Sequence, residues 1–299
     1  VYAAIRGFRP LLLDLTVPVS AGPVPVVMYI HGGGFAGGTH NAARYVPSRR
    51  ATEAVTSRGI AVASVGYRLS AEARFPAQVH DVKAAVRWLR HSGAALGIDP
   101  ARVGAWGDSA GGYLTAMLAV TAQRPELTGS VGTTGADSSI RAGVSWYGPT
   151  NLATQPRLGP PSWGNSDPAL SPEATLLGAP VEAVPELAAR ASPVTFAAAD
   201  SAPLLLIHGT ADEGVPFSQS EELVAAYRQA GAQIELEVSS TRFWCMSCQC
   251  CSATACVSRP PGSAESTLNR SATGSRVPLR CSASACGGRY VKQVRPPLP

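Results

Sequence analysis

Short apolar runs alternate with longer amphipathic stretches along the first 240 residues of the chain. The apolar runs have the composition and length of strands, and they cover residues 11–17, 24–30, 60–65, 103–106, 142–147, 204–208 and 234–238. The stretches between them that repeat apolar residues at helical spacing cover residues 44–58, 79–96, 111–123 and 218–230. Strands that alternate with helices predict an α/β fold with a mostly parallel sheet, right-handed crossovers and helices on both faces.

The strand predicted at residues 103–106 leads into Gly-Asp-Ser-Ala-Gly at residues 107–111, just before a predicted helix. A serine at such a sharp strand-to-helix turn is held in a strained conformation that exposes its hydroxyl above the sheet. The small residues Gly107 and Gly111 let the strand and the helix approach each other. The spacing therefore predicts Ser109 as a nucleophile.

A second motif, His-Gly-Gly-Gly-Phe at residues 31–35, follows another predicted strand. Acyl transfer builds negative charge on a carbonyl oxygen, and preorganised backbone N–H groups stabilise that charge. We assign Gly33, Gly34 and Ala110 as the oxyanion donors. The alternative is a glycine-rich turn and a small-residue helix start without chemistry, but two motifs in the expected order and context favour the catalytic interpretation.

These motifs resemble those of the α/β-hydrolase esterases and lipases with an HGGG oxyanion loop. The similarity is greatest to the feruloyl-esterase-like (BD-FAE type) branch, which is related to the hormone-sensitive-lipase-like esterases. It continues in Tyr-Arg-Leu-Ser at 67–70, Phe-Pro-Ala-Gln at 75–78, Trp-Tyr-Gly-Pro at 146–149 and His-Gly-Thr-Ala-Asp at 208–212. The resemblance covers roughly residues 1–238 and implies an α/β-hydrolase fold, hydrolysis of a small-molecule carboxylic ester through an acyl-enzyme on Ser109, and no cofactor or metal.

The acid of a hydrolase triad follows the nucleophile in the chain and precedes the histidine. Asp212 comes after the strand at 204–208, and a carboxylate there can orient an imidazolium. The alternative is a turn aspartate that caps the next helix. Asp108 is excluded because it belongs to the elbow itself.

The catalytic histidine is missing. It should lie in the loop after the strand at 234–238, but the chain has no histidine beyond His208. The remaining histidines are His31, His40, His80 and His91. We expect His31 to shape the oxyanion loop, and His208 is too close to Asp212 in sequence to reach Ser109 easily.

The character of the chain changes where the histidine is missing. All seven cysteines lie between Cys245 and Cys286. Residues 242–299 carry eight basic residues and one acid, so their net charge is +7, whereas the preceding residues have 17 basic and 19 acidic residues and a net charge of −2. We therefore divide the chain into a hydrolase domain at 1–238 and an irregular tail at 239–299.

Three interpretations of the tail remain open. The cysteines could form a metal or disulfide module, but their number is odd and their spacing does not match two zinc-binding pairs. A basic disordered tail would suit an anionic partner, although aromatic residues are scarce there. The third interpretation, a shifted reading frame of a GC-rich gene, is favoured. Read one base later, the codons of residues 239–244 permit a histidine at the junction of Thr241 and Arg242.

Residues 150–200 are rich in proline and lie between predicted strands, so we expect a cap or lid over the site, with a simple connecting excursion as the alternative. Two other functions compete with an impaired ester hydrolase: a catalytically dead hydrolase fold that acts as a binding protein, and a serine peptidase of the prolyl-oligopeptidase type. We expect no nucleic-acid partner. The sequence shows no signal peptide and no membrane-spanning run, which suggests a cytoplasmic protein, and the absence of an initial methionine suggests a missing N-terminal piece.

Overall fold

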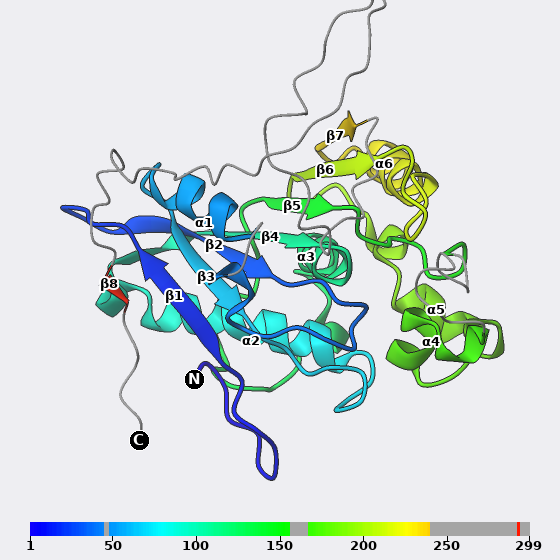
Figure 1. Ribbon diagram of the computed structural model, residues 1–299, viewed down its shortest axis with the longest axis horizontal. Coiled ribbons are helices and arrows are strands. Elements are labelled where there is room, and N and C mark those ends of the chain that lie inside the picture. The colour runs from blue at the N-terminus through cyan, green and yellow to red at the C-terminus, as the bar shows by residue number, and fades with distance from the viewer. Residues whose placement is uncertain (45–47, 156–166, 240–291, 294–299) are drawn as a thin grey trace, which may run out of the picture. The chain divides into compact units, whose positions relative to one another are not determined.

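One twisted sheet organises the part of the chain that the computed structural model describes, residues 1–44, 48–155, 167–239 and 292–293. Its strand order is β7-β6-β5-β4-β2-β3-β1-β8 (Figure 1). The strands are β1 (Leu13–Val17), β2 (Val24–Ile30), β3 (Ala61–Val65), β4 (Ile98–Asp108), β5 (Gly143–Trp146), β6 (Leu204–Gly209), β7 (Ile234–Ser239) and β8 (Lys292–Gln293). Strands β2 to β7 are parallel, whereas β1 is antiparallel to its neighbours β3 and β8.

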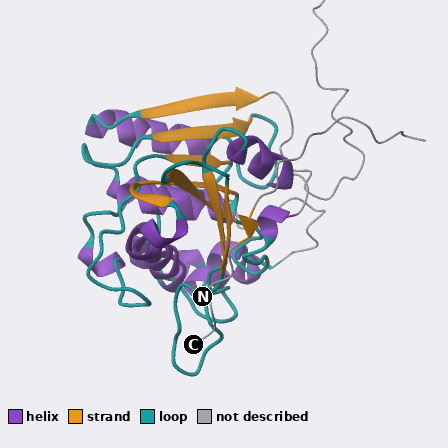
Figure 2. Ribbon diagram, turned by 90° about the vertical axis from the view of Figure 1, so that its left-hand side faces the viewer, coloured by secondary structure: helices purple, strands orange, loops and turns teal. Residues whose placement is uncertain are grey.

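Helices lie on both sides of this sheet (Figure 2). The α-helices are α1 (Ser48–Thr56), α2 (Ala77–Ser92), α3 (Ala110–Val120), α4 (Pro172–Leu177), α5 (Pro185–Arg190) and α6 (Ser218–Ala230). Short 3₁₀ helices occur at η1 (Ala42–Arg44), η2 (Ala94–Leu96), η3 (Pro125–Leu127), η5 (Pro168–Leu170), η6 (Val181–Ala183) and η7 (Pro193–Phe196). This arrangement confirms the predicted α/β fold.

The core has two parts because side chains alternate between the two faces of each strand. In β2, Val26, Met28 and Ile30 join the larger cluster, which also contains residues of α2, α3 and α6. Tyr29 faces the other way, into a smaller cluster with Trp106 that α1 covers. The central strands are thus buried on both faces, which explains why their sequences read as nearly continuous apolar runs.

The seven predicted strands and four predicted helices are all present, but several boundaries differ. Strand β4 extends to both sides of the predicted residues 103–106. Helix α2 ends at Ser92 rather than at residue 96, because the chain tightens into η2 and turns at Gly97, whose φ is 75°. Strand β8 and the short helices α4 and α5 were not predicted, since segments of two and six residues show too little periodicity.

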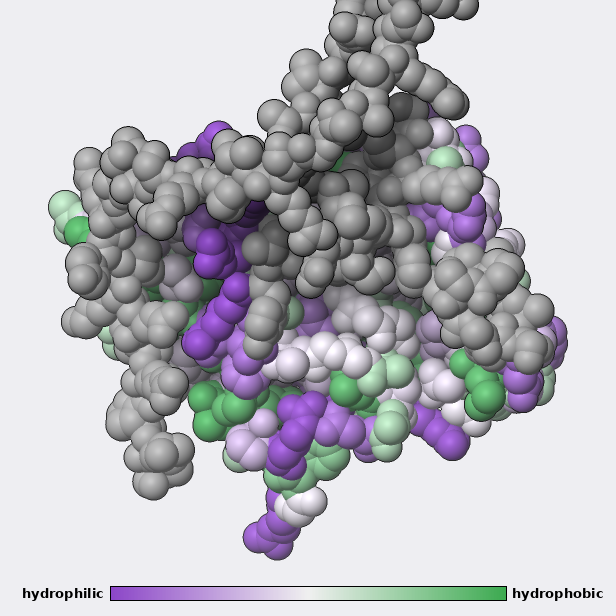
Figure 3. Space-filling view, in the orientation of Figure 1, coloured by the Kyte–Doolittle hydropathy of each residue, from purple (hydrophilic) through white to green (hydrophobic). Residues whose placement is uncertain are grey.

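The tail at 239–299 lies outside the described residues except for Ser239 and β8, and so do all seven cysteines. Among the described helices, none has the length and apolar character needed to cross a bilayer. On the face seen in Figure 3, hydrophilic and hydrophobic residues are mixed over the described surface.

Candidate functional site

Ser109 occupies the sharp turn between β4 and α3. Its backbone has φ 51° and ψ −119°, a conformation that non-glycine residues rarely adopt. Its N–H donates to the carbonyl of Trp146 at 2.8 Å, which ties the turn to the end of β5. The Ser109 hydroxyl has no hydrogen-bond partner within the described parts of the chain, so it is available to react.

Gly111 allows the first turn of α3 to lie directly against the end of β2. A Cβ atom at this position would come 1.9 Å from the carbonyl oxygen of Ile30 and 2.8 Å from that of His31. No side chain fits there, and the packing explains why a glycine follows the serine at this spacing.

The same close packing brings the glycine loop beside the elbow. A Cβ atom on Gly32 would lie 3.2 Å from the Cβ of Ser109. Gly33 and Gly34 have φ values of 111° and 58°, which favour glycine. The N–H groups of Gly33, Gly34 and Ala110 bond to no described residue, which leaves these donors open beside the serine.

His31 holds this loop in shape. Its ring stacks on Tyr67, with 4.4 Å between ring centroids, and Nδ1 donates to the carbonyl of Gly32 at 2.8 Å. The Tyr67 hydroxyl donates in turn to the carbonyl of His31 at 3.0 Å. Burial lowers the pKa of His31 to about 4, so the ring is neutral near pH 7.

Asp108 connects the elbow to β2 and the loop. Its Oδ1 accepts a hydrogen bond from the Tyr29 hydroxyl at 2.9 Å, and that hydroxyl also bonds to Ser48 Oγ at 2.8 Å. Burial raises the pKa of Asp108 to about 6, while hydrogen bonds from Tyr29 and from the backbone of Gly32 oppose the rise. The position of this carboxylate is consistent with a structural role in the elbow.

Asp212 lies in the turn after β6, next to β5 on the side away from β4. Its Oδ1 accepts hydrogen bonds from the N–H groups of Gly214 and Val215, both at 2.9 Å. Its side chain is buried, yet Oδ2 has no hydrogen-bond partner among the residues that the structure describes. Oδ1 therefore fixes the turn, and Oδ2 is left to accept a hydrogen bond from another donor.

His208 does not supply that donor, although its Nε2 lies 3.8 Å from Asp212 Oδ2. Because a carbonyl can only accept, Nε2 carries a proton that it donates to Val215 O at 2.8 Å. Nδ1 is bonded to Ser220 Oγ at 2.7 Å, and burial lowers the pKa of the ring. Both ring nitrogens are occupied, which supports the expectation that His208 is not a substitute base.

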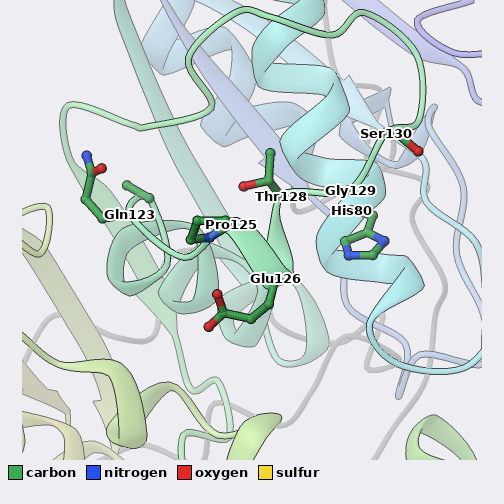
Figure 4. Close-up of a pocket in the computed structure, with 8 residues that line it drawn as sticks. His80, Gln123, Pro125, Glu126, Thr128, Gly129 and Ser130 are labelled. Carbon is green, nitrogen blue, oxygen red and sulfur yellow. The ribbon is translucent and has the colours of Figure 1, made fainter.

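His80 belongs to a different region. It lines an open cavity of about 590 Å³ with residues that follow α3, among them Glu126 and Gly129 (Figure 4). Helix α3 begins at the elbow and runs for 11 residues, or roughly 16 Å, before that loop. This cavity shares no residue with the candidate site. The described residues also contain no cluster of three or more His, Cys, Asp or Glu that could hold a metal ion.

Tyr147 is a site residue to which the sequence assigned no role. It directly follows β5, its φ is 40°, and its N–H donates to the carbonyl of Ile207 at 2.9 Å. Burial raises the pKa of its hydroxyl, and the nearby charges of Asp108 and Asp212 raise it further. The Trp-Tyr-Gly-Pro motif at 146–149 is the sequence feature that could have pointed to Tyr147.

The segment expected to form a cap reaches the glycine loop. A Cβ atom on Gly34 would lie 3.5 Å from Cγ of Pro172, the first residue of α4. Ser171 caps this helix by accepting a hydrogen bond from the N–H of Ala174 at 3.1 Å. Helix α4 therefore borders the predicted oxyanion donors.

Comparisons with known proteins bear on the family and the fold of the chain. The BD-FAE family model matches residues 13–227. A truncated carbohydrate esterase from gut microbiota has a similar structure, with a TM-score of 0.66 and 32% identity over 76% of this chain and 81% of that one.

Several curated proteins are similar in sequence, and two of them are described here. Ethyl acetate hydrolase of Pseudomonas putida is 32% identical over 78% of this chain and 68% of its own length. Esterase LipQ of Mycobacterium tuberculosis is 29% identical over 76% of this chain and 52% of its own, so the chain spans about half the length of LipQ.

Proposed function

The chain belongs to the BD-FAE family, and on that premise we propose that it is a serine-dependent hydrolase of small carboxylic esters. The observation that carries the proposal is the strained Ser109 beside the unbonded N–H groups of the glycine loop. The names of its relatives, esterases and an ethyl acetate hydrolase, support the same reaction class.

In the proposed mechanism, Ser109 Oγ attacks the ester carbonyl carbon, and the N–H groups of Gly33, Gly34 and Ala110 stabilise the resulting oxyanion. Collapse of this intermediate releases the alcohol and leaves an acyl-enzyme, which water then hydrolyses to the carboxylic acid. The unpartnered Oδ2 of Asp212 is the group that would orient a general base between itself and Ser109.

That base is missing from the chain, since His208 is committed to Val215 and Ser220 and no histidine follows it. The serine therefore keeps its proton and is a weak nucleophile near neutral pH. We expect turnover roughly 10⁴–10⁶-fold below that of an intact triad, with the oxyanion donors retaining about 10³–10⁴ over water.

Helix α4 suits the role of a cap that shapes the acyl or alcohol pocket, because Pro172 lies against Gly34. We accordingly propose that residues 150–200 form the lid of the domain at 1–238.

Turnover of p-nitrophenyl acetate tests the proposal in three forms of the protein: this chain, its Ser109→Ala variant, and a version with the alternative reading frame after residue 240. We expect a very low rate for the first two and a normal esterase rate for the third.

A low rate in all three forms would favour the competing function, a hydrolase fold that binds ligands without turning them over. Ordinary turnover by this chain that Ser109→Ala abolishes would show that another residue supplies the base.

A further inference from the structure

We propose that the cavity beside His80 binds a small oxyanion, such as a phosphate or a carboxylate group, at a site separate from the proposed ester-hydrolase centre. The cavity has a volume of about 590 Å³, and His80 of α2 and residues of the loop after α3 line it (Figure 4). The inference does not depend on the proposed function, because no lining residue belongs to that centre.

A basic stripe on α2 leads to this cavity. His80, Lys83 and Arg87 are spaced by three and four residues, so they lie on one face of the helix. Lys83 and Arg87 are almost completely buried, with 0% and 1% of their surface exposed. Lysine and arginine are rarely buried to this extent unless an opposite charge pairs with them.

The described residues give these two cations neutral acceptors instead of carboxylates. The Lys83 ammonium donates to the carbonyl of Thr121 at 2.5 Å. The Arg87 guanidinium donates to three backbone carbonyls of the loop after α3, at residues 128, 131 and 133, over distances of 2.6, 2.8 and 3.0 Å. No direct contact neutralises either positive charge, so the loop that covers them lies in a positive potential, which attracts anions.

Two carboxylates lie near enough to influence Lys83. Burial and the Arg87 charge lower the pKa of Lys83 to about 8, while the charges of Glu126 and Asp137 oppose that fall. Asp137 is paired with Arg90 at 3.5 Å. Glu126 is the only acid among the described residues that line the cavity, and it is exposed, so its side chain can turn toward solvent when an anion enters.

The cavity wall also offers hydrogen-bond donors. The carbonyl of Thr128 accepts from Arg87, and a trans peptide group points its N–H opposite to its C=O, so the N–H of Gly129 points away from the guanidinium. This N–H, the Gln123 amide and the Ser130 hydroxyl make no hydrogen bond to any residue that the structure describes. An oxyanion accepts bonds from such donors, and a charged acceptor makes those bonds stronger.

His80 adds a further donor on the α2 side. Gly129 packs directly on its ring, since a Cβ atom on Gly129 would come 2.5 Å from His80 Cγ. The ring Nε2 is buried and has no partner in the described ranges. Burial is the main reason that the pKa of His80 is lowered, which favours the neutral ring. A neutral imidazole carries one N–H, and an oxyanion supplies the acceptor that this ring lacks.

Isothermal titration calorimetry of the full chain with inorganic phosphate at about pH 7 tests the site. We expect saturable binding, and weaker binding of acetate because acetate carries less charge. Tighter binding of acetate than of phosphate would assign the site to carboxylates and support the inference in that form. The basic residues at 242–299 can also attract phosphate, so variants of the cavity decide where it binds.

Glu126→Gln should tighten phosphate binding by about three- to tenfold, because it removes the negative charge that lines the cavity. A site for a metal cation would respond in the opposite direction. His80→Ala should weaken phosphate binding by about three- to tenfold, since it removes a donor to the anion. The matched control is His91→Ala, which changes an exposed histidine in the last turn of the same helix and should leave binding unchanged.

Glu126 is exposed, so Glu126→Gln keeps the test decisive even if His80→Ala does not fold. Weaker phosphate binding by Glu126→Gln would overturn the inference. Equal binding by the parent chain and Glu126→Gln would also overturn it and would assign the phosphate to another part of the chain. The same conclusion follows if neither of these two proteins binds phosphate.

Discussion

Replacing Gly111 by alanine tests how closely helix α3 lies against strand β2. Helix propensity alone predicts a gain of about 0.5–1 kcal/mol, since glycine is a poor helix residue. The structure predicts the opposite sign, because the new Cβ would lie 1.9 Å from the Ile30 carbonyl oxygen, and an ordinary contact begins at 3.4 Å.

Restoring an ordinary contact requires the first turn of α3 to move by about 1.5 Å relative to β2. Overpacking in a core typically costs about 1–3 kcal/mol, and here the obstacle is backbone, which cannot rotate away. We therefore take the upper end of that range, about 3 kcal/mol, and subtract the helix gain of about 0.5–1 kcal/mol, so Gly111→Ala should lower the free energy of unfolding by about 2–2.5 kcal/mol. For a domain of this size that corresponds to a fall in Tm of roughly 4–10 °C.

Thermal unfolding followed by circular dichroism measures this shift. Gly22→Ala is the control, since a Cβ on Gly22 would meet nothing within 4 Å, and its Tm should change by no more than about 2 °C. An unchanged or higher Tm for Gly111→Ala would refute the close approach on which the placement of Ser109 depends.

Three further predictions concern buried polar groups. Burial lowers the pKa of Lys83 to about 8, so the unfolded state holds more protons than the folded state between about pH 8 and 10.5. The free energy of unfolding should therefore rise with pH in that range, and urea titrations should show that Lys83→Met removes this slope. Burial raises the pKa of Asp108 to about 6, so the folded state holds more protons than the unfolded state between about pH 4 and 6. The free energy of unfolding should therefore fall by roughly 3 kcal/mol as the pH rises through that range, and Asp108→Asn should abolish the fall. His208→Ala should lower the free energy of unfolding by about 2–4 kcal/mol in urea, since it leaves Ser220 Oγ and Val215 O without their partner, and a stable variant would contradict the structural role of this ring.

The sequence alone determined the fold class and the place of the candidate nucleophile in the chain. Alternation of apolar runs and amphipathic stretches is a local property, and parallel strands joined by helices leave few topologies. The motif at 107–111 could be placed on a strand-to-helix turn for the same reason, because the residues that build the turn are neighbours in sequence. The absence of a late histidine is likewise visible without coordinates.

Only the tertiary structure decided which groups meet. Asp212 and Ser109 are about a hundred positions apart, and it is the sheet order β4-β5-β6 that brings their strand ends to one edge. Whether Asp212 has an unoccupied oxygen, and whether His208 has an unoccupied nitrogen, depends on partners such as Val215 and Ser220 that the turn after β6 folds inward. Burial, hydrogen bonding and strand order depend on residues that are far apart in the chain, so a local sequence pattern does not predict them for an individual residue.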